Sequence, residues 1–130
     1  DWMAMTDDGG LFGAQLDPNA VFEAHGMMFY DRALRPRDVT DGLSQTIVVA
    51  EDTGRGWKAQ GEWANGENIF LQEGPPNQTN NNEMFSEHPG GVNVALCDGS
   101  VHFLSETVDL DTLAALCTRS AQDVVQRFPD

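Results

Sequence analysis

The sequence has few positive charges. Lys and Arg make up 7 of its 130 residues, against 21 Asp and Glu, which gives a formal net charge of −14. Such a chain repels the phosphates of nucleic acids and of anionic membrane surfaces, so we expect no nucleic-acid partner. A solvated acidic surface and the collection of divalent cations both remain open.

The sequence also lacks a long apolar run. No stretch approaches the roughly 18 apolar residues of a transmembrane helix, and the N-terminal "DWMAMTDDGG" has no basic segment followed by an apolar core, as an intact signal peptide has. With 130 residues the chain has the length of one domain. Because it begins at Asp1 rather than Met, we expect a soluble C-terminal segment of a longer precursor.

Cysteine is scarce, and its spacing excludes two classes of site. Cys97 and Cys117 lie 20 residues apart, and no C-x-x-C pair exists, which excludes a zinc ribbon and a thioredoxin-type motif. In an exported protein Cys97 and Cys117 could form a disulfide. Two buried free thiols are the alternative.

The motifs of common hydrolases are missing as well. The sequence has no H-E-x-x-H and no G-x-S-x-G, and its three histidines, His25, His88 and His102, are far apart. Among 21 acidic residues, the pairs Glu51/Asp52 and Glu62/Glu67 arise by chance. We therefore expect no enzymatic activity, no catalytic residues and no bound zinc.

Two features leave a binding function open. The loops "TDDGG", "DVTDG" and "NGEN" offer oxygen ligands for Ca²⁺, although none matches an EF-hand loop. A candidate sugar platform consists of Trp57, Trp63, Asn65 and Glu67. Packing of both tryptophan rings in the core or at an edge is the alternative interpretation, and no cofactor is required.

Hydrophobic patterns predict the main elements. The β-branched "TIVVAE" (46–51) is typical of a strand buried on both faces, and "NIFLQ" predicts another strand over 68–72. Residues 35–45 predict a short helix or paired turns before the 46–51 strand. Residues 73–91 are polar and rich in Pro and Asn, which predicts a long loop that is either functional or mobile.

The C-terminal third gives the clearest local pattern. Two alternating runs flank Asp98-Gly99, which predicts a β-hairpin over 92–105 with a type I′ turn, and Val92, Val94 and Leu96 on one face. Residues 109–120 then predict a short amphipathic helix with Asp109 as its N-cap and Arg119 near its C-terminal end. Its apolar positions are Leu110, Leu113, Ala114 and Cys117.

His88 and Asp98 invite comparison with a catalytic pair. The six residues from Val92 to Cys97 span about 20 Å at strand rise, so a direct contact requires residues 88–91 to fold back along the strand. We expect separate structural roles instead, in which His88 anchors the long loop and Asp98 sets the turn.

These residues also resemble a known family. His88, nine intervening residues and then Asp98-Gly99 form the H-x9-D-G signature of prepilin-like proteins that are abundant in planctomycetes and related bacteria. The "HPGG" before the hairpin and "RDVTDGLSQTIVVAE" upstream are similar to that family too, over roughly residues 35–125. In this motif His88, Gly90, Gly91, Asp98 and Gly99 are expected to be structural.

The resemblance implies a pilin-like globular domain that lacks the N-terminal hydrophobic helix. We expect an α+β fold with a small antiparallel sheet, a C-terminal hairpin and a short amphipathic helix after it. The implied function is non-enzymatic, in a type II secretion or type IV pilus-like assembly, with protein partners and a periplasmic or extracellular location. Membrane contact would come only through the missing helix. The alternative is an extracellular module that binds Ca²⁺ or a glycan.

Overall fold

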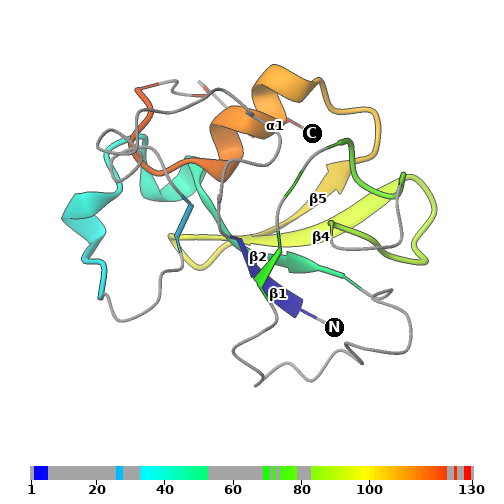
Figure 1. The fold of residues 1–130 in the computed structure, drawn as a ribbon, viewed down its shortest axis with the longest axis horizontal. Coiled ribbons are helices and arrows are strands. Elements are labelled where there is room, and N and C mark those ends of the chain that lie inside the picture. The colour runs from blue at the N-terminus through cyan, green and yellow to red at the C-terminus, as the bar shows by residue number, and fades with distance from the viewer. Residues whose placement is uncertain are drawn as a thin grey trace.

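The fold is a β-sheet with one α-helix packed on one of its faces (Figure 1). A computed structural model describes residues 2–5, 26–27, 33–52, 69–70, 72, 74–78, 83–122, 125 and 128–129. The strands are β1 (Trp2–Met5), β2 (Ile47–Glu51), β3 (Ile69–Phe70), β4 (Gly91–Leu96) and β5 (Val101–Ser105), and the α-helix is α1 (Leu110–Cys117). The predicted α+β class is confirmed.

The strand order across the sheet is β3-β1-β2-β4-β5. Neighbouring strands are antiparallel except β1 and β3, which pair parallel through Ala4↔Ile69 and Met5↔Phe70. The sheet is therefore mixed at one edge and antiparallel elsewhere. Within the strand predicted over 68–72, β3 occupies Ile69–Phe70, Gln72 lies outside any strand, and residues 68 and 71 are outside the described residues.

The central strand, β2, is buried more deeply on one face than on the other. Ile47 and Ala50 are buried, whereas Val48 and Val49 are half-buried, and the pairing with β4 shifts register between Ile47 and Val49. The prediction of a strand buried on both faces therefore holds for the face of Ile47 and Ala50, whereas Val48 and Val49 are only half-buried. Before β2, the predicted paired turns are two 3-10 turns, Pro36–Asp38 and Leu43–Gln45.

The hairpin is confirmed, but its turn differs from the expected one. The Gly99 N–H donates to the Leu96 carbonyl and the Leu96 N–H to the Ser100 carbonyl, both at 2.9 Å, so the loop has three residues. Gly99 (φ 86°) is the one loop residue with a positive φ. A type I′ turn requires two; a glycine bulge after an ordinary turn requires only one.

Contacts with the start of β2 hold this longer loop. The Cys97 N–H donates to the Thr46 carbonyl at 2.9 Å and the Asp98 N–H to the Leu43 carbonyl at 3.0 Å. Both donors, the N–H groups of Cys97 and Asp98, belong to the three-residue loop. The turn type thus depends on residues about fifty positions away in the sequence, which the local Asp-Gly pattern does not reveal.

The helix begins as predicted, because the Asp109 carboxylate accepts hydrogen bonds from the Thr112 N–H (2.9 Å) and hydroxyl (2.6 Å). Its buried residues are Leu113, Ala115, Leu116 and Cys117. Leu110 and Ala114 were expected on the apolar face, but Leu110 is 47% exposed and Ala114 half-buried. With eight residues, α1 is the longest helix of the described ranges, and none of these could cross a membrane.

Arg119 does not remain at the helix end as a solvated charge. It is buried, and its Nη1 donates to the Gly26 carbonyl at 3.0 Å. Its own carbonyl accepts from the Asp41 N–H at 3.1 Å, and the buried Asp41 carboxylate accepts from the N–H groups of Ala121 (2.8 Å) and Gln122 (3.0 Å). The chain after α1 is therefore fastened to the turns before β2.

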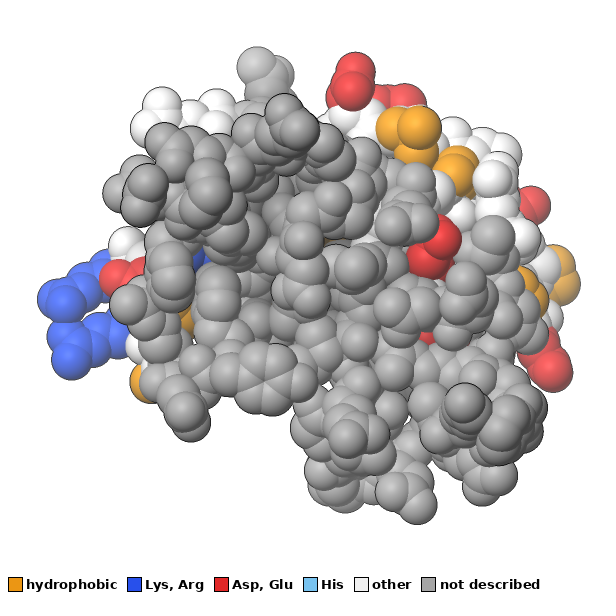
Figure 2. Space-filling view, viewed as in Figure 1, with side chains coloured by type: hydrophobic (Ala, Val, Ile, Leu, Met, Phe, Trp, Pro, Cys, Tyr) orange, Lys and Arg blue, Asp and Glu red, His pale blue; other side chains and the backbone are white. Residues whose placement is uncertain are grey.

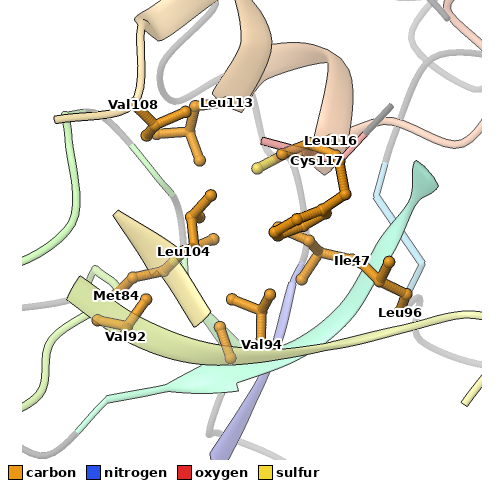
Figure 3. Close-up of a cluster of buried hydrophobic side chains, with 12 residues drawn as sticks. Ile47, Met84, Val92, Val94, Leu96, Leu104, Val108, Leu113, Leu116 and Cys117 are labelled. Carbon is orange, nitrogen blue, oxygen red and sulfur yellow. The ribbon is translucent and has the colours of Figure 1, made fainter. Parts of the chain in front are cut away.

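The core lies between α1 and the sheet, and Figure 3 shows its side chains converging there. The hairpin contributes Val92, Val94, Leu96 and Leu104, which confirms the predicted alternation in β4. The helix contributes Leu113, Leu116 and Cys117. Met84, from the polar loop, is also fully buried and lies beside Val92 in the same view.

Candidate functional site

The clearest polar cluster joins the two segments that carry the family resemblance. Glu51, the last residue of β2, points its carboxylate at β4 and at the loop before it. Its Oε2 accepts from the Asn93 N–H at 2.8 Å, and its Oε1 accepts from Asn93 Nδ2 at 3.1 Å. The same Oε1 lies 3.3 Å from His88 Nε2. We call Glu51, His88 and Asn93 the clip.

The Glu51 side chain adds one more hydrogen bond between β2 and β4, beyond the end of their backbone ladder. The last backbone pair of this ladder is Ala50↔Val94, so beyond it Asn93 turns its N–H towards β2. The Glu51 carboxylate takes that hydrogen bond in place of a carbonyl. A bond to an ionised acceptor is stronger than one between neutral groups. The Glu51 side chain is 13% exposed and that of His88 is 55% exposed, so Glu51 is the central member of the clip.

The loop next to the clip is tied down by Ser86 and Asn77. The Ser86 hydroxyl is buried, donates to the Gly91 carbonyl at 2.7 Å and accepts from the His88 N–H at 3.1 Å. Asn77, with φ 64°, accepts from the Ser86 N–H at 2.8 Å through its side-chain oxygen. Its Nδ2 donates to the Gly91 carbonyl at 3.2 Å. These bonds fix the backbone from which His88 reaches Glu51.

A second set of bonds anchors the start of the same loop. Gln72 is buried, and its Oε1 accepts from the Met84 N–H at 2.9 Å. The Glu83 carboxylate accepts from the Gly74 N–H at 3.0 Å. Polar residues therefore position Met84 in the core. The polar composition of 73–91 indicated a loop but gave no sign of this buried methionine.

Two glycines before β4 have different requirements. Gly90 has φ 88° and open space around the position of a Cβ. A Cβ on Gly91 would lie 2.1 Å from the Leu104 carbonyl oxygen and 2.8 Å from Phe103 Cε1. Gly90 is thus needed for its backbone conformation, whereas Gly91 is needed because β5 and the Phe103 ring approach too closely for any side chain.

At the other end of β4, Asp98 organises the hairpin turn. Its Oδ1 accepts from the Ser100 hydroxyl at 2.6 Å and from the Ser100 N–H at 2.8 Å. These two bonds hold the pKa of the Asp98 carboxyl below its ordinary value. His102 Nε2 lies 3.0 Å from the Ser100 hydroxyl, and its ring stacks on Phe128 with centroids 4.6 Å apart.

His88 and Asp98 therefore occupy opposite ends of β4 and have different partners. His88 contacts Glu51 at the end of β2, while Asp98 contacts residues near the beginning of β2. The strand between them fills most of the nine-residue spacing. General acid–base work needs two groups within hydrogen-bond reach of one substrate, and this arrangement does not provide it.

Two groupings have the composition of a catalytic triad but the wrong geometry. In Ser86, His88 and Glu51, the serine hydroxyl contacts the backbone of His88 and not its ring. In Ser100, His102 and Asp98, the serine proton is donated to the aspartate, so the histidine does not act as its base. In a working triad the imidazole takes the serine proton and the acid orients the imidazole.

Cys97 offers no reactive thiolate. Burial, with a smaller contribution from the charge of Asp98, raises the pKa of the Cys97 thiol to about 11, so it is protonated at neutral pH. Neither Cys97 nor Cys117 is in a disulfide. Cys117 belongs to the core. Cys97 follows the inward-facing Leu96 at the end of β4, so it begins the hairpin loop on the face of the sheet opposite to the core. The disulfide weighed from the sequence is not formed in this structure.

The residues considered for ligand binding divide into two groups. Trp57, Trp63, Asn65 and Glu67 lie outside the described residues, as do the loops "TDDGG" and "NGEN". In "DVTDG", Asp38 accepts from the Arg35 N–H at 2.8 Å and Asp41 holds the chain after α1. Across the residues with a described placement, no three His, Cys, Asp or Glu side chains gather in a way that could hold a metal ion.

Comparison with protein families gives a match over most of the chain. A family model described as a protein of unknown function (DUF1559) matches residues 3–73 and 53–111. The chain belongs to this family. Within the DUF1559 match lie the clip residues Glu51, His88 and Asn93 and the turn residues Asp98 and Gly99.

Searches of curated proteins and of solved structures gave no match. The DUF1559 match therefore supports a family relationship and leaves the activity to be argued from the chain's own residues.

Proposed function

We propose that this DUF1559 chain is the globular domain of an exported, pseudopilin-like protein. Its role is structural or interaction-based, in a type II secretion or type IV pilus-like assembly. Protein subunits are its partners, and its location is periplasmic or extracellular. Membrane attachment comes through an N-terminal helix outside this sequence.

The clip is the observation that carries a non-enzymatic role. The histidine and the aspartate of the H-x9-D-G pattern have separate partners, and each fastens one end of β4. The glutamate at the end of "TIVVAE" completes the first fastening. Catalytic residues of a family signature converge on one substrate site. The polar residues of this signature instead stabilise separate parts of the fold, which is typical of residues that the fold itself requires.

Composition supports export and a protein partner. A formal net charge of −14 disfavours nucleic acid and anionic lipid. Binding between protein subunits needs no cofactor, and the resemblance over residues 35–125 is to prepilin-like proteins. The family match is consistent with this proposal, although its own description names no function.

The experiment is processing of the full-length gene product in its native host. The proposal expects that the protein is shortened by the prepilin peptidase and reaches the cell surface or periplasm. Deletion of that peptidase should leave the longer form in the inner membrane. A protein whose size and location do not change in the deletion strain would contradict the proposal.

A control keeps folding separate from export. The Glu51→Gln variant should lower the stability of the domain while the prepilin peptidase still cleaves the precursor, because cleavage occurs outside this domain. Loss of cleavage in that variant would mean that the domain itself directs processing, which the proposal does not predict.

A further inference from the structure

Strand β5 has an open edge in the described part of the sheet. The strand order ends β2-β4-β5, so β4 is the one strand neighbour of β5 among the residues with a described placement. The pairing of β4 with β5 runs without a register shift from Gly91↔Ser105 to Ala95↔Val101. An edge of this kind presents a row of backbone groups to which another strand can pair.

The hydrogen bonds at the two ends of the hairpin show which groups face outward. The Leu96 N–H donates to the Ser100 carbonyl, and the Glu106 N–H donates to the Gly90 carbonyl, each at 2.9 Å. Bonded and non-bonded pairs alternate along an antiparallel ladder. Val101, Phe103 and Ser105 are therefore the non-bonded positions towards β4, and their backbone groups point to the open edge.

The side chains of the same strand are apolar where they are exposed. Val101 is 63% exposed and Phe103 is 46% exposed, and both lie on the face opposite to the buried Leu104. The sequence "VHFLS" (101–105) contains no Lys, Arg, Asp, Glu or Pro. Natural edge strands are usually protected by charge, proline or a bulge, and β5 has none of these.

We propose that β5 is a self-association surface, on which a second copy of this chain pairs its own β5 in the antiparallel direction. The two five-stranded sheets then join into one continuous sheet. This inference does not depend on export or on a pilus-like role, since it uses only the edge of the described sheet.

The strand is self-complementary in that direction. With the two-fold axis at Phe103, the outward N–H and carbonyl of each Phe103 pair with those of the other copy. The Ser105 N–H of each copy donates to the Val101 carbonyl of the other; the Ser105 carbonyl already accepts from the Val108 N–H at 3.1 Å. The two Phe103 rings lie on the same face, where aromatic cross-strand pairs stabilise a sheet.

Charge also favours this strip over other surfaces as the contact between copies. Two chains of net charge −14 repel each other, and an uncharged contact strip keeps the acidic groups of one copy away from those of the other. In the proposed register, Glu106 lies opposite Ser100 of the second copy rather than opposite another acid. Like charges directly opposed across strands are avoided.

The competing contact is a head-to-tail one between opposite charges. Arg35 and Arg37 are exposed, and the blue side chains in Figure 2 project at the opposite end of the view from most of the red ones. Such a contact weakens when salt is added, because screening acts on attraction between exposed charges. Pairing through β5 should strengthen with salt, because screening reduces the repulsion between the two acidic copies.

The first test is sedimentation velocity of the 130-residue chain over a range of protein and salt concentrations. An edge-to-edge contact is smaller than the roughly 1,200 Å² of stable interfaces, so we expect a reversible dimer. The mass should rise from 14.2 kDa towards twice that value as protein concentration increases, and more strongly at high salt. A monomer up to about 1 mM protein at high salt, or a dimer that salt dissociates, would overturn the proposal.

Two matched variants test whether the contact between the two copies lies on β5. Phe103→Glu should weaken the dimer at least tenfold, whereas Leu110→Glu adds the same charge at a position of similar exposure, 47%, and should leave the dimer intact at high salt. Circular dichroism establishes that both variants are folded. Equal effects of the two substitutions would overturn the assignment to β5.

Cross-linking provides a readout that does not depend on dimer strength. In a Cys97→Ser background, Phe103→Cys should form a disulfide-linked dimer under mild oxidation, because position 103 faces itself across the axis. Val101→Cys should form much less, because position 101 faces position 105 of the second copy. Equal cross-linking at the two positions would contradict the proposed register.

Discussion

Glu51 contacts His88 through Oε1, at 3.3 Å, while its other oxygen holds the Asn93 N–H at 2.8 Å. One carboxylate thus joins β2, β4 and the loop between residues 83 and 91. The partners are unequal: the Asn93 bond is short and half-buried, and the imidazole is more than half exposed.

This inequality predicts unequal effects of substitution. Glu51→Gln should lower the free energy of unfolding by about 1–3 kcal/mol, because amide donors then face the donors of Asn93 and His88. His88→Ala should cost less than about 1 kcal/mol, as the loss of an exposed polar contact does. Urea unfolding measures both, with Glu87→Gln, an exposed neighbouring acid, as the control near zero. An equal loss in the two variants would show that the His88 contact, and not the Asn93 bond, is dominant.

The two neighbouring glycines should respond differently to alanine. Gly91→Ala should destabilise by about 3 kcal/mol, at the upper end for overpacking, because the new Cβ meets a backbone carbonyl that cannot move aside. Gly90→Ala should cost only about 1–2 kcal/mol, since the strain lies in φ and the space is open. Thermal or urea unfolding separates them. A larger effect at Gly90 would mean that β5 can shift away from Gly91.

Cys97 should react slowly with thiol reagents in the folded chain. A pKa raised to about 11 from 9.0 leaves on the order of 100-fold less thiolate at neutral pH. Asp98→Asn should speed the reaction, because the nearby negative charge also raises this pKa. The measurement is the rate of reaction with an aromatic disulfide reagent, folded and in urea. A native rate close to the unfolded rate would exclude the raised pKa.

The raised pKa of the Cys97 thiol also predicts that the chain loses stability in alkali. The unfolded thiol ionises near pH 9 and the folded one near pH 11, so the stability that is present below pH 9 should decrease as the pH rises towards 11. Cys97→Ser should remove this part of the pH dependence. An unchanged alkaline slope in that variant would assign the effect to other groups.

Asp98 should make a contribution to stability that is lost in acid rather than in alkali. Its carboxyl pKa is lowered by the Ser100 hydroxyl and N–H, so its contribution is present above the ordinary value of 3.8 and decreases as the pH falls through the lower folded value. Ser100→Ala should move the folded pKa back towards 3.8. Nuclear magnetic resonance titration of the Asp98 carboxyl measures this directly, and an ordinary pKa in the unsubstituted chain would contradict the described turn.

Titration calorimetry examines the alternative binding function. Under the proposed structural role, neither Ca²⁺ nor a panel of glycans should produce heat or shift the thermal midpoint. A saturable signal that disappears in Trp57→Ala or Trp63→Ala would instead favour a binding module. The same titration in Glu67→Gln would then distinguish a sugar platform from a cation site.

The sequence was sufficient where structure depends on neighbouring residues. Alternation in β4, the Asp109 cap and the buried positions Leu113 and Cys117 follow from local period and capping. The clip could not be predicted in the same way, because Glu51 and Asn93 are 42 residues apart and share no local pattern. Met84 was missed because its polar neighbours concealed the one apolar side chain that enters the core.

Sequence reasoning was also limited at Leu110 and Arg119. Helical spacing places Leu110 on the apolar stripe, but this first residue of α1 is 47% exposed. Arg119 follows the helix and finds a buried carbonyl at Gly26, a contact across 93 positions. Both outcomes depend on the surrounding tertiary structure, which periodicity does not encode.

The three-residue loop at Cys97–Gly99 determines which apolar side chain of β5 enters the core. With a two-residue turn at Asp98-Gly99, Val94 would pair with Phe103, and Leu104 would face outward. In the observed register Val94 pairs with His102 and Val92 with Leu104, so Leu104 is buried and Phe103 is exposed. A one-residue slip reverses the two faces of a strand. An isolated hairpin peptide has neither the Thr46 nor the Leu43 carbonyl, and it is therefore free to adopt the slipped pairing.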